Sequence, residues 1–137
     1  MEIAEFVDRF RPRITVWVDW ARLRRLPLGV ETRVISSHDE LAALGLPWYV
    51  DAVGASCNYD IPGARRLRVG EAVGLIDGPL SDRRAGMEEK AKELESREGL
   101  VLPAYSRGGS PILLDGCHRS LALMKAPGNP EIELFTV

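Results

Sequence analysis

The residues best suited to chemistry lie in one short stretch, DGCHR at 115–119. An apolar run at 112–114 ends there, and the pattern that follows is typical of a helix. Its first residues would be Cys117, His118 and Arg119. A helix N-terminus carries partial positive charge and favours acidic side chains, so a cation and a titratable imidazole conflict with the local field.

A bound anion would explain this placement. The free N–H groups of a first helical turn converge on one point, and the helix dipole adds to them. Gly116 lets the backbone approach a ligand closely, Arg119 can offer a bidentate fork, and His118 can donate a further hydrogen bond. The sequence therefore predicts a phosphate site at Gly116–Arg119. Spacing alone leaves equally open a surface turn in which Arg119 pairs with a carboxylate.

Length and composition narrow the classes of protein. The chain has 137 residues, of which 45% are hydrophobic and 28% charged, which fits one globular domain with a real core. A net charge of −2 gives no bulk electrostatic argument for nucleic acid. No apolar stretch approaches the roughly 20 residues of a membrane span, and the first ten residues do not resemble a signal peptide. We expect a cytoplasmic protein that binds neither nucleic acid nor membrane.

Cysteine and histidine are scarce. Cys57 and Cys117 make neither a disulfide framework nor a CxxC pair, and His38 and His118 are too few to predict a zinc cluster. We therefore expect no resident metal ion. Cys57 is expected to be a small buried residue.

The first half of the chain mixes extended and helical patterns. Residues 14–20 alternate apolar and polar types and predict a strand, and 33–36 predict a shorter one. Residues 46–64 are expected to be a loop or short helical turns. An extended pattern restarts at 67–69.

Two helices are also predicted before residue 100. Ser37 and Glu40 have the spacing of a capping box, which opens a short helix over 37–44. His38, in its first turn, is expected to be exposed to solvent. Residues 81–98 follow the 3.6-residue period and form the clearest helix of the chain.

The last third predicts a hairpin, a helix and a strand. Apolar runs at 100–103 and 112–114 flank a turn at 107–110 and predict a hairpin or two neighbouring strands. A helix is expected over 118–126 and a terminal strand over 132–135. The chain is therefore predicted to be α+β, a single small domain with a mixed sheet and packed helices.

Residues 82–126 resemble the ParB/sulfiredoxin superfamily. The shared pattern is a charged helix, a Gly-Leu-x-x-Pro connection at 99–103, a hairpin, and a strand running into Gly-x-x-Arg at a helix start. The resemblance covers about a third of the chain. It implies one domain over 1–137, in which 66–137 form a ParB/sulfiredoxin-like nucleotide-binding part and 1–65 are strands and loops of unknown type.

The resemblance implies a nucleotide, ATP or a related one with Mg²⁺, whose phosphates lie on the motif. Sulfiredoxins carry Gly-Cys-His-Arg, and their cysteine attacks an activated sulfinic phosphoryl ester. Free serine kinases carry Asp-Gly-x-His-Arg. ParB proteins hydrolyse CTP and add a DNA-binding region after the motif. Only eleven residues follow Ala126 here, so we expect no such region and no partition role. The implied phosphate-binding residues are Gly116, Cys117, His118, Arg119 and Ser120.

Three functions follow from the resemblance. The first is a phosphotransferase or nucleotide hydrolase, acting on an unidentified small-molecule or protein acceptor. Its base would be Asp115; Glu71 and Asp77 are weaker carboxylate candidates. Across the possible enzyme functions, the candidate catalytic residues are Asp115, Cys117 and His118.

The second function is a sulfiredoxin-like reductase. Its nucleophile would be Cys117, whose pKa is expected to fall at a helix N-terminus. The third is a non-enzymatic module that senses a nucleotide or binds a partner. Trp17, Trp20 and Trp48 could form its interface, although core packing is the more usual fate of tryptophan.

Overall fold

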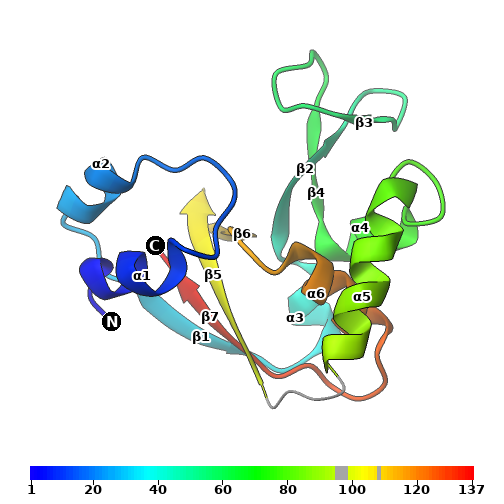
Figure 1. Cartoon of the computed structure of the whole chain (residues 1–137). Helices are drawn as coiled ribbons and strands as arrows, with labels where there is room; N and C mark the ends of the chain where they lie inside the picture. Colours follow the sequence, from blue (N-terminus) through cyan, green and yellow to red (C-terminus); the bar gives the residue numbers. More distant parts are fainter. Residues whose placement is uncertain (95–98, 108) are drawn as a thin grey trace.

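One mixed sheet crosses the computed structural model, which describes residues 1–94, 99–107 and 109–137 (Figure 1). Within these ranges the strand order is β1-β7-β5-β6-β2-β3, and β4 pairs with β2 on a separate branch. Pairs β5–β7 and β2–β6 are parallel, and the other pairs are antiparallel. The strands are β1 Glu31–Ile35, β2 Gly45–Val50, β3 Ser56–Cys57, β4 Arg65–Arg68, β5 Leu100–Arg107, β6 Ser110–Leu113 and β7 Ile132–Thr136.

Helices lie on both faces of the sheet (Figure 1). Helices α3 to α6 contribute to the larger core cluster, and α1 contributes to the smaller one. The helices are α1 Ile3–Phe10, α2 Trp20–Arg25, α3 His38–Ala42, α4 Val69–Gly74, the 3-10 turn η1 Ser81–Arg83, α5 Arg84–Leu94 and α6 Cys117–Lys125.

Alternation along β5 separates the two cores. Leu102 and Ala104 are fully buried in the larger cluster, whereas Val101 and Tyr105 pack against the smaller one. On the smaller side, the rings of Phe6 and other aromatic residues of α1 and β7 form its centre. The sheet is thus covered on both faces, and a single small α+β domain with a mixed sheet is confirmed.

Local signals in the last third of the chain are confirmed. β5 and β6 form the expected antiparallel hairpin, with Ala104 opposite Leu113. The second strand ends at Leu113, and the helix that follows is α6, one residue earlier at each end than expected. β7 confirms the terminal strand, and β1 confirms the strand near 33–36.

The expected strand at 14–20 is wrong. Residues 14–19 are irregular, and α2 begins at Trp20, where the Asp19 side chain accepts a hydrogen bond from Arg22 N–H. The alternation does separate two sides, because Val16 packs on the smaller core while Trp17 is 87% exposed. Among the described residues, however, no strand pairs with this segment, so alternating burial arises here without a ladder.

The expected loop at 46–64 is also wrong at its start. β2 lies inside the sheet and meets β6, β3 and β4, and its residues Leu46, Trp48 and Val50 are buried. Its apolar run is too short to distinguish a buried strand from a buried turn by periodicity. β4 confirms the extended pattern near 67, but the chain then turns helical at Val69.

Two further expectations about helices are changed. The predicted helix 81–98 starts as η1 and continues as α5 to Leu94; residues 95–98 lie outside the described ranges. The short helix α3 is confirmed, with Ser37 as its N-cap. His38 is partly buried rather than exposed, because its Nε2 lies 3.2 Å from the carbonyl oxygen of Leu123. Cys57 is half-buried on the short strand β3.

No helix in the described ranges has the length and apolar character that crossing a membrane requires.

Candidate functional site

Helix α6 starts on a glycine that no other residue could replace without strain. Gly116 is its N-cap, with φ 81° and ψ 20° in the left-handed region. A Cβ atom on Gly116 would lie 2.3 Å from Cδ2 of Leu102 on β5. Both the backbone conformation and the tight packing therefore require glycine.

The first turn of α6 leaves its backbone donors without intrahelical partners. The first such bond runs from Ser120 N–H to the Gly116 carbonyl oxygen, at 2.9 Å. The N–H groups of Cys117, His118 and Arg119 therefore precede the hydrogen-bond ladder. In the part of the chain that the structure describes, no side chain caps this helix. The geometry is that of an anion-binding helix N-terminus.

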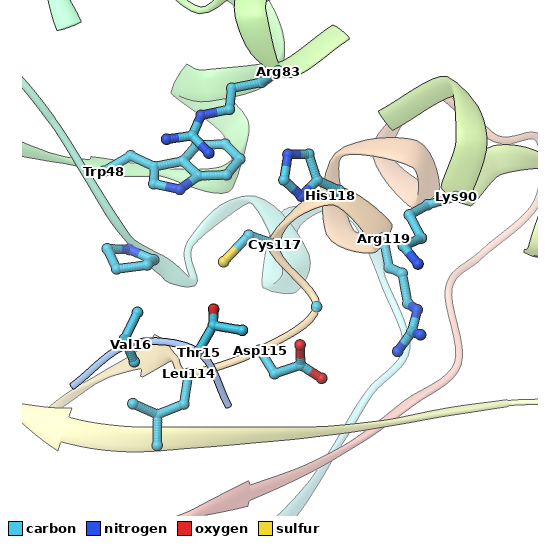
Figure 2. A pocket seen from close by; sticks show the side chains of 12 residues that line it. Thr15, Val16, Trp48, Arg83, Lys90, Leu114, Asp115, Cys117, His118 and Arg119 are labelled. Carbon is cyan, nitrogen blue, oxygen red and sulfur yellow. The ribbon is translucent and has the colours of Figure 1, made fainter. Parts of the chain in front are cut away.

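A hollow of about 190 Å³ opens at this helix end (Figure 2). Three cationic side chains line it: Arg83 from η1, Lys90 from α5 and Arg119 from α6. Among the described residues that line the hollow, Asp115 carries the one carboxylate. Positive side chains and the first turn of α6 therefore line the same space. The remaining lining residues are Thr15, Val16, Pro47, Trp48, Leu114, Gly116, Cys117 and His118.

Arg119 has hydrogen-bonding capacity to spare. Its side chain is 16% exposed, and its Nε is buried without a hydrogen-bond partner in the described residues. Its Nη2 lies 3.9 Å from a Glu93 carboxylate oxygen, which is a loose ion pair. Buried guanidinium donors are normally satisfied, so Arg119, within the described part of the chain, keeps an unpaired donor beside the hollow that it lines.

The imidazole of His118, on α6, packs against the indole of Trp48 and against helix α5. The ring centroids of His118 and Trp48 are 5.3 Å apart. The Arg83 guanidinium lies over the Trp48 ring, 4.6 Å from its centroid (Figure 2). On the α5 side, a Cβ atom on Gly86 would come within 2.6 Å of His118 Cδ2. The glycine thus allows the imidazole to pack against the helix backbone.

The environment of His118 favours the neutral imidazole. Burial is the main cause that lowers its pKa, followed by the positive charges of Arg83 and Lys90. Asp82 and Glu89 act in the opposite direction with smaller effect. A neutral imidazole can donate one hydrogen bond and accept another, and an anion beside it would draw its pKa upward.

The expected fall in the pKa of Cys117 is wrong. The thiol is half-buried and its sulfur points into the hollow (Figure 2). Burial first, and then the charge of Asp115, raise the pKa of Cys117 to about 12, against a smaller lowering by Arg83. Desolvation outweighs the helix terminus, so the sulfur is a neutral thiol at ordinary pH.

Asp115 is tied to the N-terminal part of the chain. Its Oδ2 accepts from Arg13 Nε at 3.2 Å and lies 3.0 Å from Arg13 Nη2. Arg13 Nη2 also donates to the carbonyl oxygen of Val101 on β5. This contact holds the segment that supplies Thr15 and Val16 to the hollow. Asp115 thus lines the site and anchors its wall.

Other expected site residues lie elsewhere. Ser120 is fully buried, and both its Oγ and its N–H donate to the Gly116 carbonyl oxygen rather than facing the hollow. Glu71 pairs with Arg65 at 2.7 Å, and Asp77 pairs with an arginine of α5 at 2.6 Å. Neither carboxylate lines the site.

The sequence analysis missed the cations contributed by the neighbouring elements. Arg83 and Lys90 are seven residues apart, which places them on one face of the predicted 81–98 helix, so this spacing was an available signal. Trp48 and Arg13 gave no comparable signal, because their contacts join distant parts of the chain. Of the tryptophans, Trp48 is buried at the site and Trp17 is exposed.

No family model matches this chain, and no curated protein or solved structure matches it either. The resemblance to the ParB/sulfiredoxin superfamily therefore stays a prediction. In the described residues, no three side chains of His, Cys, Asp or Glu gather in a metal-binding group. Function must be argued from the geometry of the hollow itself.

Proposed function

We propose that the hollow at the N-terminus of α6 binds the phosphates of a nucleotide, ATP or a related one, and that the protein transfers or hydrolyses the terminal phosphoryl group. One observation carries the proposal. Residues 117–119, whose N–H groups precede the helical hydrogen-bond ladder, line a single hollow together with Arg83 and Lys90. Such a set of donors suits a group with several negative oxygens.

Each residue has a role in this proposal. The guanidinium of Arg119 would donate hydrogen bonds to phosphate oxygens. Arg83 and Lys90 would stabilise the charge on the phosphoryl group during transfer. Neutral His118 would donate a hydrogen bond to a phosphate oxygen. Asp115 would accept the proton of the attacking hydroxyl or water.

Among the described residues, the donor set offers one carboxylate for Mg²⁺. This ion commonly binds through one or two carboxylates together with substrate phosphates, and Asp115 is the lining carboxylate available. Held mainly by the nucleotide, the ion would neutralise phosphate charge. The residues of the chain would then position the phosphates and move the proton.

The reductase alternative depends on a thiolate at Cys117, and the raised pKa of that thiol disfavours it. Cys117→Ser distinguishes the two enzymes. The serine keeps the small side chain and the backbone N–H, so a phosphotransferase or hydrolase should keep its ATP turnover. Turnover that disappears while ATP binding stays intact would favour the reductase. The measurement is phosphate release at saturating ATP with Mg²⁺.

The binding claim is tested on Arg119→Ala. Loss of hydrogen bonds to a charged group costs about 1.5–3 kcal/mol, so ATP affinity should fall roughly ten- to hundredfold by isothermal titration. Arg33→Ala, an exposed arginine on β1, is the matched control and should bind as the wild type does. Unchanged ATP affinity in Arg119→Ala would refute the phosphate site. Binding of ATP with no turnover of any kind would instead support a non-enzymatic nucleotide sensor.

A further inference from the structure

A second and larger pocket adjoins the anion hollow. Its volume is about 680 Å³, and it shares Val16, Pro47 and Leu114 with the hollow. Much of its lining belongs to the smaller core cluster, including Val18, Leu23 and Tyr105. Two groups of side chains line it. Val18 and Leu23 come from the N-terminal segment, and the second group consists of Tyr49, Tyr59 and Tyr105.

The lining of this pocket, as far as the structure describes it, contains no acidic or basic side chain. Arg66 positions two of the tyrosine rings. Its Nη2 donates to the hydroxyl of Tyr49 at 2.7 Å and to that of Tyr105 at 3.4 Å. Each hydroxyl thus accepts from the guanidinium and keeps its own proton to donate. The volume is in the range of small-molecule sites, which are mostly apolar with few polar groups. The pocket suits an uncharged molecule with an apolar or aromatic body.

We infer that this pocket binds the phosphoryl acceptor, an uncharged alcohol or phenol with an apolar or aromatic body; the inference rests on the proposed function. Position supports it. Val16 and Leu114, which line both cavities, are the chain neighbours of Thr15 and Asp115 in the hollow (Figure 2). A hydroxyl at this boundary would therefore reach the hollow, where the phosphates are proposed to bind and where Asp115 supplies a carboxylate.

The transfer step balances with these groups. The Asp115 carboxylate takes the hydroxyl proton as the hydroxyl oxygen bonds to the terminal phosphorus of ATP. The bond from that phosphorus to its bridging oxygen breaks, and the electron pair leaves on ADP. The products are a phosphate monoester and ADP, and no oxidant or reductant takes part.

A nucleobase fits this pocket less well than an apolar acceptor. Its edges carry several polar groups, and burying these without partners is costly. The side chains of the pocket present mainly hydrocarbon and ring faces, with tyrosine hydroxyls and the Trp17 indole as the polar exceptions. The acceptor is thus the occupant that leaves the fewest polar groups unsatisfied.

The test uses 2-phenylethanol as the neutral probe and 3-phenylpropanoate as its charged counterpart. Trp17→Ala with Tyr59→Ala removes two aromatic side chains that are 87% and 77% exposed, so the fold should be retained. Val53→Ala, which is 89% exposed and outside the pocket, is the matched control. Binding is followed by ligand-observed NMR, and phosphate esters by ³¹P NMR with ATP and Mg²⁺.

The neutral probe should bind the wild type and the control alike, and the double variant should bind it roughly tenfold more weakly, since stacking surfaces are lost. The charged counterpart should not bind. A panel of 2-phenylethanol, indole-3-ethanol and 1-hexanol should yield at least one phosphate monoester. ATP and tripolyphosphate should keep their affinities for the double variant.

Three results would overturn the inference. Probe affinity that the double variant does not change, or a panel without any ester, would remove the acceptor role. A double variant that loses affinity for ATP but not for tripolyphosphate would make the pocket a nucleobase site. Failure of the proposed function is separate: the wild type would then bind neither ATP nor tripolyphosphate, whatever the alcohol probe does.

Discussion

Two helix N-termini in this molecule are satisfied in different ways. At α3, the Ser37 hydroxyl accepts a hydrogen bond from the backbone N–H of Glu40 at 3.1 Å, and two acidic residues lie in the first turn. Hydrogen bonds from the Ser36 backbone and then from Ser37 hold the pKa of Glu40 below its usual value. At this helix end, side chains of the protein itself accept from a free N–H group and offset the positive end of the helix dipole.

The N-terminus of α6 has neither a side-chain cap nor an acidic first turn among the described residues. Its N-cap is Gly116, its first turn has no acidic residue, and Arg119 adds positive charge. The difference shows that the chain can cap a helix with its own side chains and does not do so here. The donors at α6 are available to a ligand, which is why we place the phosphates there and not at α3.

The largest expected effect comes from the glycine that begins α6. In Gly116→Ala, the left-handed conformation costs about 1–2 kcal/mol, and overpacking against Leu102 adds about 1–3 kcal/mol. Gly54→Ala is the matched control, because Gly54 also has a positive φ of 86° but its Cβ would meet no atom within 4 Å. Urea unfolding should show a larger loss for Gly116→Ala. Equal losses would show that the tight contact with β5 has no energetic weight.

The sequence predicted those parts of the site that depend on local signals. The Ser37 cap, the hairpin of β5 and β6, and the turn at Gly116 all follow from residues within a few positions of one another. Each is specified by backbone conformation or short-range hydrogen bonds. For the same reason, the anion-binding geometry of the α6 N-terminus could be predicted before its surroundings were known.

The rest depends on contacts between distant parts of the chain. The pairing of Arg13 with Asp115 spans 102 positions, and nothing near either residue indicates it. The thiol of Cys117 has a helix N-terminus beside it, but its pKa is decided by burial under other segments. The alternation at 14–20 indicated the correct sides, yet strand formation also needs a partner, which local sequence does not supply.

A smaller effect is expected from pH, and it sharpens the contrast between the two helix ends. The folded pKa of His118 is below the ordinary value of 6.5, so below that pH the unfolded chain binds a proton that the folded chain binds less readily. The His118 contribution to the free energy of unfolding should therefore be highest above pH 6.5, fall as pH drops from 6.5 towards the folded pKa, and level off below it.

Thermal unfolding between pH 8 and pH 5 measures this dependence. His118→Asn should flatten the His118 part of the fall. Saturating tripolyphosphate should also reduce the fall, because an adjacent anion favours the imidazolium. If the pH dependence of His118→Asn is as steep as that of the wild type, the assignment of this fall to His118 is contradicted.

The most direct test of the phosphate site is a ¹⁵N-HSQC titration with tripolyphosphate, which carries no base. The account predicts saturable shifts of the backbone amides of Cys117, His118 and Arg119, with the capped Glu40 amide at α3 unchanged. Arg119→Ala should require higher concentrations for the same shifts. Amides at 117–119 that do not move at saturating ligand, or that move no more than the Glu40 amide, would contradict the central claim.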